Sequence, residues 1–416
     1  CPDVTAEFSR VIEEIIVVEK LEEALAPVVS FKRLKPLKKD GKFVPSYEPV
    51  ALRTINPMDK IKRNKPEDIE YTGDQGYKLV DVYDNKIEMK TFLAQLSDED
   101  LTCIVRGEGM SSPKVTPGTA SAFGGVTKSL EGFGIPIASC ADGPSGIRMD
   151  CGTEAFSLPN GTAIGSTFNE ELVEKLYQME GMELRKNNID SLLGPGINIH
   201  RNPLNGRNFE YISEDPQLTG LMAKAQVKGL SYAGVVGTMK HFAGNNQEFH
   251  RRDLDSIVSE RALREIYLKG FEIAVKEGNG SSIMTSYGGL NGIWTAGNYD
   301  LNTSILRNEW GFEGIVMTDW WAEINEEGQK PTMQNTGPMI RSQNDLYMVT
   351  VDSESNSLKD NSMEYIKTGK VTRGEFQRSA ANICKMLMKL PVMDRFLGRS
   401  PEEDVKVVGQ EDITLL

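Results

Sequence analysis

Short apolar runs alternate with longer amphipathic segments over most of this chain. Each short run is bounded by polar or turn-forming residues and has the length of a buried parallel strand. Strands are therefore predicted at residues 135–138, 189–193, 235–239, 282–285, 314–318 and 345–351. Between them, apolar residues recur at helical spacing, which predicts helices at 169–186, 217–233, 260–277, 300–310, 358–368 and 372–388.

This alternation indicates one fold class. Most successive strand candidates are separated by ~30–50 residues, the size of a unit made of one strand and one helix. Repeated units of this kind build a parallel sheet with right-handed crossovers. We therefore expect an α/β fold, a TIM-like (β/α) barrel at residues 91–395, with first strands that are irregular.

Two helix starts carry capping signals. Ser97 precedes three acidic residues, which suits an N-cap and the first turn of a helix. Thr372 and Glu375 have the spacing of a capping box at the start of the last predicted helix. Both signals place helix boundaries inside the predicted barrel.

The N-terminal part of the chain lacks this periodicity. It contains a basic, proline-bearing stretch at residues 31–39 and several further prolines up to Pro66. Such composition is typical of an extended connection rather than a packed element. We expect the end of one domain at residues 1–35 and an extended linker at residues 36–90.

Two later segments are also irregular. Residues 322–341 are polar and contain glycines and prolines, which is typical of a lid, a partner contact or a disordered loop. The chain is expected to become a polar tail from Pro391 onward. Residues 396–416 are assigned to that C-terminal tail, outside the barrel.

Charge and composition exclude some classes of function. The formal net charge is −13 at pH 7, which disfavours a nucleic-acid binder and suits a neutral substrate. No apolar run reaches the ~18 residues of a membrane span, so no membrane association is expected.

The cysteines and histidines suggest neither a disulfide framework nor a metal site. Five cysteines are scattered without a C-x-x-C pair, and we expect buried free thiols in a reducing compartment. The chain has three histidines, and no cluster has zinc-like spacing, so neither a metal nor a cofactor is expected. From the free thiols and the lack of a secretory leader before Cys1, we predict a cytoplasmic location.

Polar side chains follow five of the predicted strands. In a barrel, the carboxyl ends of parallel strands meet at one mouth, so these residues should lie together. The candidates, in chain order, are Asp142, Arg207, Lys240, His241, Tyr287, Asp319 and Trp320.

Each of these residues also has a structural interpretation. Asp142 precedes Gly-Pro and could form a turn, and Asp319 could cap a helix. Arg207 could pair with Glu210 or Glu214. Lys240 could extend along an apolar surface to solvent, His241 could be a core histidine, and Tyr287 and the tryptophans could be packing aromatics. Five strand ends would have to carry such groups by coincidence for every structural interpretation to hold.

The set of side chains suits a neutral polyol. Charged and imidazole groups can form directed hydrogen bonds with hydroxyls, and Trp320 can offer an apolar face to a sugar ring. Glycoside cleavage needs two carboxyl groups, which lie only ~5–5.5 Å apart in retaining enzymes. We expect Lys240 and Arg207 to stabilise an ionised Asp319, as suits a nucleophile.

Several long motifs, in order, resemble glycoside hydrolase family 3 β-glucosidases. They are Gly-Arg-Asn-Phe-Glu-Tyr at residues 206–211, Ser-Glu-Asp-Pro at 213–216, Lys-His-Phe-Ala-Gly-Asn-Asn-Gln-Glu at 240–248, Asp-Ser-Ile-Val-Ser-Glu-Arg-Ala-Leu-Arg-Glu-Ile-Tyr at 255–267, and Met-Thr-Ser-Tyr at 284–287 with Asn-Gly at 291–292. The resemblance extends from about residue 96 to about residue 390.

The resemblance implies a retaining hydrolase that removes terminal non-reducing β-D-glucosyl residues from a β-glucoside or short β-glucan oligosaccharide. Asp319 would be the nucleophile that forms the glycosyl-enzyme. The sugar would be held by Asp142, Arg207, Lys240, His241 and Tyr287, and the subsite lined by Met284 and Trp320. Residues 244–247 lack the His-Asp pair of relatives that act on N-acetylglucosaminides.

The resemblance also implies a missing proton donor. In these β-glucosidases the acid/base glutamate belongs to a separate α/β sandwich domain. Residues 1–35 resemble the end of the fibronectin-like domain that precedes the barrel in circularly permuted members, so we expect this chain to be their C-terminal part. A second chain or domain would supply the acid/base residue. The alternatives are a β-xylosidase or α-arabinofuranosidase, or a non-catalytic sugar-binding fragment.

Overall fold

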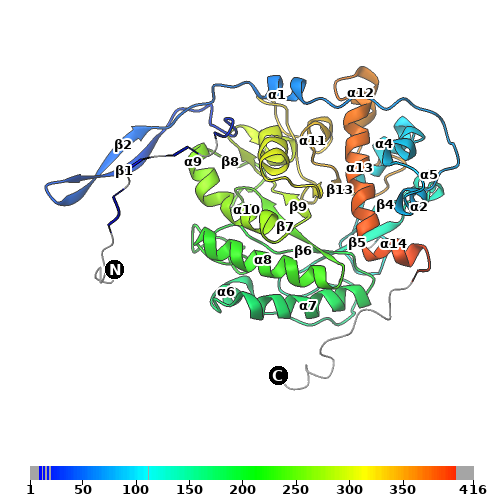
Figure 1. The fold of residues 1–416 in the computed structure, drawn as a ribbon, viewed down its shortest axis with the longest axis horizontal. Coiled ribbons are helices and arrows are strands. Elements are labelled where there is room, and N and C mark those ends of the chain that lie inside the picture. Colours follow the sequence, from blue (N-terminus) through cyan, green and yellow to red (C-terminus); the bar gives the residue numbers. More distant parts are fainter. Residues whose placement is uncertain (1–8, 12, 15, 18–19, 111, 400–416) are drawn as a thin grey trace.

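The computed structural model describes residues 9–399 except 12, 15, 18, 19 and 111 (Figure 1). Its centre is an eight-stranded sheet with the order β12-β9-β7-β6-β5-β4-β3-β13. A parallel bridge between Met317 and Leu346 joins the two ends of this order, so the sheet nearly closes. The predicted α/β barrel is confirmed.

Six barrel strands overlap the six predicted runs. They are β5 (Ile137–Asp142), β6 (Ser191–Leu193), β7 (Val236–Phe242), β9 (Ser282–Thr285), β12 (Ile315–Met317) and β13 (Tyr347–Thr350). β5, β6, β7, β9 and β12 pair in parallel in that order. Their carboxyl ends therefore share one mouth, as the alternation of strands and helices predicts.

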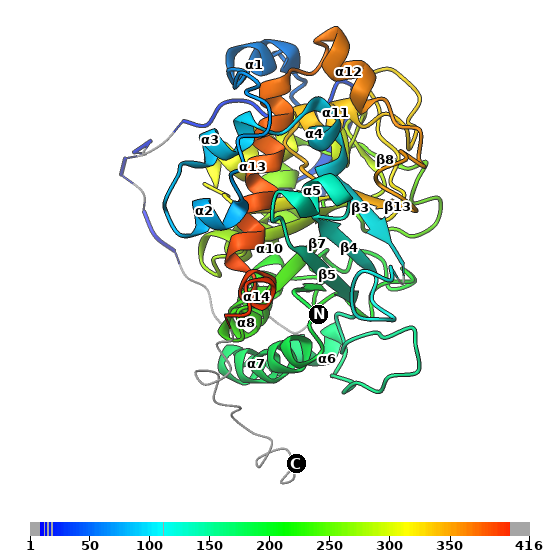
Figure 2. The same cartoon turned by 90° about the vertical axis from the view of Figure 1, so that its right-hand side faces the viewer.

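The first two barrel strands depart from the regular pattern. β3 (Arg106–Gly109) and β4 (Ser121–Gly124) are not among the predicted runs, and β4 pairs antiparallel with both β3 and β5 (Figure 2). Their glycines allow close packing, since a Cβ on Gly107 would lie 2.3 Å from Sδ of Met348. These sequences have little β propensity, so tertiary packing decides their conformation.

Helices cover the outside of the barrel (Figure 1). The longest are α7 (Glu170–Lys186), α8 (Pro216–Tyr232) and α13 (Arg373–Lys389), all within predicted helical segments or one residue beyond them. Shorter helices are α4 (Asp98–Ile104), α5 (Lys128–Gly132), α6 (Gly161–Gly165), α9 (Glu260–Ala262), α10 (Lys269–Lys276), α11 (Gly337–Arg341) and α12 (Ser362–Thr368). The predicted N-cap at Ser97 before α4 and the predicted capping box at Thr372 before α13 are both confirmed, and Ser97 also forms a capping box with Asp100.

Three predicted segments differ in detail. Two predicted helices contain π-helical turns, at Leu263–Tyr267 and throughout Asp300–Glu309. The segment predicted as an irregular loop at 322–341 contains α11. A separate small sheet contains the strands β8 (Asp255–Ser256), β10 (Gly289–Leu290) and β11 (Ile293–Trp294), and a 3-10 helix follows at Thr295–Gly297.

The N-terminal segment is more structured than an extended linker. β1 (Lys32–Lys39) and β2 (Lys42–Pro49) form an antiparallel hairpin that projects from the barrel (Figure 1). The expected domain boundary after residue 35 therefore falls inside β1. The hairpin is followed by α1 (Pro57–Arg63), α2 (Leu79–Tyr83) and α3 (Met89–Ala94), and the expected start of the barrel at residue 91 falls inside α3.

The C-terminal end of the barrel corrects another expectation. Residues from Pro391 onward were predicted to be a polar tail, but Pro391–Phe396 form helix α14. Val392 and Met393 are buried, so their apolar side chains keep this segment on the core. Most of the predicted tail at 396–416 lies outside the described residues.

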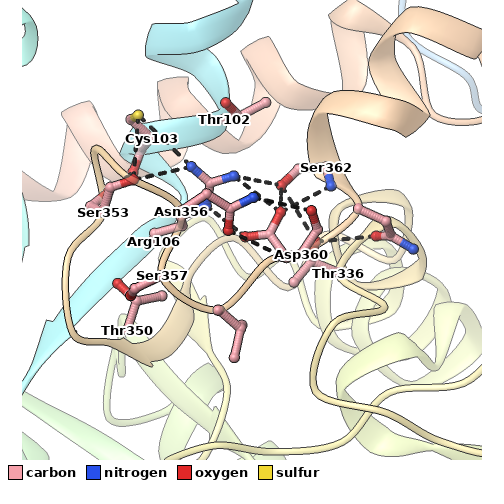
Figure 3. Close-up of polar contacts among 12 residues, drawn as sticks. Thr102, Cys103, Arg106, Thr336, Thr350, Ser353, Asn356, Ser357, Asp360 and Ser362 are labelled. Atoms are coloured by element: carbon pink, nitrogen blue, oxygen red, sulfur yellow. Dashed lines mark hydrogen bonds and ion pairs between the residues drawn. The ribbon is translucent and has the colours of Figure 1, made fainter.

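A buried ion pair connects β3 with the loop that follows β13 (Figure 3). Arg106 at the start of β3 donates from Nε to Oδ2 of Asp360 at 2.6 Å and from Nη2 to Oδ1 at 3.0 Å. Its Nη1 also donates to the backbone oxygen of Ser353 at 3.2 Å. One side chain thus fixes the loop that connects β13 with α12.

The cysteines only partly follow the expectation of buried thiols. Cys103, Cys140, Cys151 and Cys384 are free, whereas Cys1 lies outside the described residues. Burial raises the pKa of Cys140 to about 12, and Cys384 is equally enclosed. Cys151 is exposed, which contradicts the expectation for that residue.

Over the part of the chain that the structure describes, no helix combines the length and apolar character needed to cross a membrane.

Candidate active site

The predicted site residues lie at the carboxyl ends of the barrel strands. Asp142 is the last residue of β5, Lys240 and His241 lie in the last part of β7, and Met284 lies in β9. The remaining residues follow strand ends: Arg207 after β6, Tyr287 after β9, and Asp319 with Trp320 after β12. The contacts below link most of these side chains into one cluster around Asp319.

The turn that carries Asp319 is held by the neighbouring strand. Thr318 Oγ1 accepts the backbone N–H of Met348 at 2.8 Å, and the Trp321 N–H donates to the Met348 oxygen at 2.7 Å. Both bonds connect the end of β12 to β13. The sequence Thr-Asp-Trp-Trp therefore places its acid at a fixed point of the mouth rather than at the start of a long helix.

Asp319 is a buried carboxylate with one uncommitted oxygen. The residue is 6% exposed, and its Oδ1 accepts the backbone N–H of Trp320 at 2.7 Å. Among the residues that the structure describes, Oδ2 has no hydrogen-bond partner. Nε2 of His241 lies 3.7 Å from Oδ2, and the hydroxyl of Tyr287 also acts on this carboxylate. Such an unpaired buried oxygen is costly and is therefore typical of a functional site.

The protonation of Asp319 departs in part from the expectation. Burial raises the pKa of Asp319 above its ordinary value, while the charges of Arg207 and Lys240 oppose that shift. The two cations act in the expected direction, but burial outweighs them. A carboxylate that is held ionised against desolvation is poorly solvated and correspondingly reactive.

Lys240 is buried and bridges two acids. Its Nζ donates to Oδ1 of Asp142 at 2.7 Å and lies 3.7 Å from Oε2 of Glu210. The Lys240 side chain is 4% exposed, so it does not extend to solvent. Burial raises the pKa of Asp142, but Lys240 and Arg207 outweigh it and hold that pKa below its ordinary value.

Arg207 forms the pair that its structural interpretation predicts. Its Nε donates to Oε1 of Glu210, whose side chain is only 4% exposed. Glu210 also faces Lys240. Acids and cations therefore alternate along one row, in the order Asp142, Lys240, Glu210 and Arg207. From the sequence, Glu210 is predicted only as a possible partner of Arg207. Its position three residues after that arginine is the signal that could have placed it in the site.

His241 is a buried, neutral imidazole. Its pKa lies well below the ordinary value because of burial and the nearby positive charges of Arg207, Lys240 and Arg251. Asn198 fixes its backbone, since Asn198 Oδ1 accepts the His241 N–H at 2.8 Å. Nδ1 contacts the hydroxyl of Tyr211 at 3.0 Å, and Nε2 faces Asp319.

The apolar side chains of the set are packed and not freely exposed. Tyr287 is 5% exposed, and the guanidinium carbons of Arg251 and Arg252 lie 4.4 and 4.9 Å from the centre of its ring. Trp320 is 8% exposed and donates from Nε1 to the Ala120 oxygen at 3.3 Å. Met284 is buried in β9. Packing therefore describes these residues as well as a lining role does.

This cluster suits recognition of an uncharged, hydroxyl-rich molecule. It offers fixed donors and acceptors beside one unengaged carboxylate oxygen, with an aromatic side chain next to it. Within the described ranges, no three or more His, Cys, Asp or Glu residues are grouped so that they could hold a metal ion. The roles of the individual side chains remain predictions.

Known proteins resemble this chain over most of its length. The model described as "Glycosyl hydrolase family 3 N terminal domain" matches residues 78–386. A β-glucosidase from Ruminococcus albus is 54% identical over 403 residues, which are 97% of this chain and 42% of that protein. The structure of a β-glucosidase from Paenibacillus barengoltzii superposes with a TM-score of 0.90 and 59% identity, over 91% of this chain and 42% of the other.

A relative with a different printed activity also matches. An exo-α-(1→6)-L-arabinopyranosidase from Bifidobacterium breve is 44% identical over 205 residues, which are 47% of this chain and 27% of that protein. The chain thus spans less than half the length of these three relatives.

Proposed function

This chain belongs to glycosyl hydrolase family 3, and from that membership we propose that it forms the barrel of a retaining β-glucosidase. Its substrate would be a terminal non-reducing β-D-glucosyl residue of a β-glucoside or short β-glucan oligosaccharide. The observation that carries this proposal is the buried Asp319, whose Oδ2 has no hydrogen-bond partner among the described residues and lies inside a ring of polar side chains.

The reaction would proceed by double displacement at Asp319. Oδ2 attacks the anomeric carbon, the bond to the glycosidic oxygen breaks, and a proton donor protonates the leaving oxygen. The resulting glycosyl-enzyme is an ester of Asp319. Water, deprotonated by the same donor in its basic form, then attacks the anomeric carbon and releases glucose with retained configuration.

The remaining site residues would hold the sugar. Asp142 and Lys240, already paired with one another, can each form a further hydrogen bond with a sugar hydroxyl, and Arg207 and His241 supply donors beside them. Tyr287 would donate its hydroxyl near Asp319. Met284 and Trp320 would contact the apolar face of the ring.

We propose that the acid/base carboxylate lies outside this chain. Three acids of the mouth are already committed to ion pairs: Asp142 with Lys240, Glu210 with Arg207, and Glu248 with Arg251. General acid assistance typically contributes ~10²–10⁴-fold, so a second domain or chain would be needed for full activity. The end of a fibronectin-like domain would still lie in the N-terminal segment, but its boundary cannot follow residue 35, which lies inside β1.

Exposed apolar side chains support such a partner. They lie on loops that follow parallel barrel strands, where a soluble surface is normally polar, and they are Phe156, Leu204, Phe209, Phe249, Trp321 and Val351. A domain that brings a carboxylate to Asp319 would have to contact these loops.

Covalent trapping tests the proposal. A 2-deoxy-2-fluoro-β-D-glucoside with a good leaving group slows the second displacement and leaves the sugar on the nucleophile. We expect a mass increase of one fluoroglucosyl group on the peptide that contains Asp319, and none in Asp319→Asn. Labelling of another carboxylate, or equal labelling of the variant, would contradict the assignment.

The arabinopyranosidase relative favours a second candidate activity, on pentosides, the class to which the β-xyloside and α-arabinofuranoside alternatives from the sequence belong. Initial rates on nitrophenyl β-D-glucoside, β-D-xyloside and α-L-arabinosides separate the two. The third alternative, a non-catalytic sugar-binding fragment, predicts glucose binding without turnover even when the missing part is present.

We also propose a cytoplasmic location, supported by the free thiols at Cys103, Cys140, Cys151 and Cys384. Fractionation of the source cells tests it. Recovery of the protein outside the cytoplasmic fraction would contradict the proposal.

A further inference from the structure

A chain of hydrogen bonds lies behind His241 and is not part of the set considered above. The hydroxyl of Tyr211, a residue that is 0% exposed, contacts His241 Nδ1 at 3.0 Å. Asn245 Nδ2 donates to the same hydroxyl at 2.8 Å and to Glu248 Oε1 at 2.9 Å. Arg251 Nη1 donates to the other oxygen of Glu248 at 2.8 Å.

The chemistry of Glu248 fixes the direction of these bonds. Its two oxygens face the guanidinium of Arg251 and the amide of Asn245, and a carboxylate accepts hydrogen bonds and donates none. The amide atom of Asn245 that faces it must therefore be the nitrogen. Because that same nitrogen contacts Tyr211, the phenol oxygen is an acceptor toward Asn245.

The proton of Tyr211 then has one destination. Its hydroxyl contacts two described groups, Asn245 and His241, and the first already acts as a donor. If His241 Nδ1 also carried a proton, the buried O–H would have no acceptor, which costs about 1–3 kcal/mol. Tyr211 therefore donates to Nδ1, and the single proton of the neutral imidazole lies on Nε2.

We propose that Tyr211, Asn245 and Glu248 are positioning residues that hold His241 as the Nε2–H tautomer, so that it donates toward Asp319 and a bound sugar hydroxyl. Nε2 lies 3.7 Å from Asp319 Oδ2, which places its proton at the reacting side of the site. The part of this inference that concerns the sugar rests on the proposed function, whereas the tautomer does not.

Arg251 connects this chain of hydrogen bonds to Tyr287. The guanidinium of Arg251, which pairs with Glu248, stacks on Tyr287 at 4.4 Å. The charged groups that face His241 are Arg207, Lys240 and Arg251, with Asp319 beyond Nε2. Burial, helped by these three cations, keeps the imidazole neutral, so its tautomer, rather than its charge, is the property left for Tyr211 to control.

Neutron diffraction of the complete protein after exchange into heavy water tests the tautomer directly. We expect deuterium on Nε2 of His241 and not on Nδ1. In Glu248→Gln, Arg251 should take the amide oxygen and turn the amide NH₂ toward Asn245. Asn245 would then flip, Tyr211 would donate to it, and the deuterium should move to Nδ1.

Kinetics provide the functional readout. Tyr211→Phe removes the donor to Nδ1, and we expect kcat to fall by about 10–100-fold with a smaller change in KM, by analogy with the partners that orient metal-binding imidazoles. Tyr365→Phe is the matched control, since Tyr365 is also buried and its hydroxyl donates to Asn335 at 3.2 Å outside this cluster. That control should keep both the tautomer and kcat.

The outcomes separate the two proposals. Deuterium on Nδ1 of the wild-type protein, or an unchanged tautomer in Glu248→Gln, overturns the positioning role. Deuterium on Nε2 in a protein that cleaves no glycoside contradicts the proposed function and leaves the tautomer assignment intact. If Tyr211→Phe does not fold, Glu248→Gln, which is nearly isosteric, still provides both readouts.

Discussion

Asp319 and Asp360 are both buried aspartates on loops after neighbouring barrel strands, yet their surroundings differ. Asp360 Oδ1 accepts from Arg106 Nη2 and from the Ser362 N–H, each at 3.0 Å, and Oδ2 accepts from Arg106 Nε at 2.6 Å (Figure 3). Asp319 makes one backbone hydrogen bond at Oδ1, and its Oδ2 has no partner in the described part of the chain.

The difference separates a buried acid whose charge is compensated from one whose charge is not. At Asp360 the guanidinium and serine donors replace the water that burial removes, so the charge is compensated. At Asp319 the nearest cations belong to Arg207 and Lys240, which are already committed to Glu210 and Asp142. Burial alone does not distinguish these aspartates; the saturation of their oxygens does.

The largest expected effect concerns activity at Asp319. In the complete enzyme, Asp319→Asn should reduce turnover of aryl β-glucosides by roughly 10³-fold or more, because the amide oxygen is a poor nucleophile. Steady-state assays and circular dichroism measure activity and fold together. Retention of more than a few per cent of activity in a folded variant would show that Asp319 is not the nucleophile.

At Asp360, the partner of Arg106, a substitution should change stability rather than activity. Arg106→Met leaves Asp360 buried without its partner and should lower the free energy of unfolding by about 3–5 kcal/mol. Urea denaturation measures the loss, and turnover per folded molecule should stay within a few-fold of wild type. The matched control is Asp84→Asn at the exposed pair with Arg399, where the loss should be far smaller.

Stability at Asp319 should change in the opposite direction. Asp319→Asn should raise the free energy of unfolding at neutral pH by about 0.5–2 kcal/mol, the usual gain when an active-site strain is relieved. The folded pKa of Asp319 lies above its unfolded value, so the ionised acid destabilises the fold only once the pH rises above that unfolded value. The gain should therefore shrink as the pH falls toward about 4.

Asp142 provides the control for that pH dependence. Its folded pKa is lowered, so its contribution stabilises the fold above the unfolded pKa and is lost as the pH falls through the folded one. Asp142→Asn should consequently lower stability at neutral pH. Equal and parallel pH profiles for the two variants would contradict the assigned environments.

The smallest effect tests how completely Asp360 is saturated. The hydroxyl of Ser362 also donates to Asp360 Oδ1, and Ser362→Ala removes that donor while the serine's backbone N–H and both bonds from Arg106 remain. The loss of unfolding free energy should therefore be only about 1 kcal/mol. Thermal unfolding at one pH measures it. A loss as large as that of Arg106→Met would mean that the serine, not the ion pair, carries the compensation.

The barrel was predictable wherever the local pattern was strong. The runs around Ile283 and Val316 are short, apolar and followed by helical periodicity, and they form β9 and β12 at the predicted places. β3 and β4 were missed because Arg-Gly-Glu-Gly and Ser-Ala-Phe-Gly have no apolar alternation. Their glycines pack against side chains from distant segments, such as Met348 and Leu387.

The position of the candidate site residues at one mouth was predictable, but the network between them was not. The position of Lys240 at a strand end indicated the mouth, and the structure brings it to Asp142, almost a hundred positions earlier in the chain. Tyr211, Asn245 and Glu248 were missed because none of them follows an apolar strand directly. Their importance depends on mutual hydrogen bonds, which sequence spacing does not encode.

By itself, the sequence determined the alternation of strands and helices, the helix caps at Ser97 and Thr372, and the acids and bases that end the strands. These properties depend on residues within one or two turns of each other. The tertiary structure decided how the sheet closes, which buried aspartate is saturated and which is not, and the direction of the hydrogen bonds behind His241. Those outcomes depend on desolvation and on partners far apart in the chain, so they exist only once the barrel has formed.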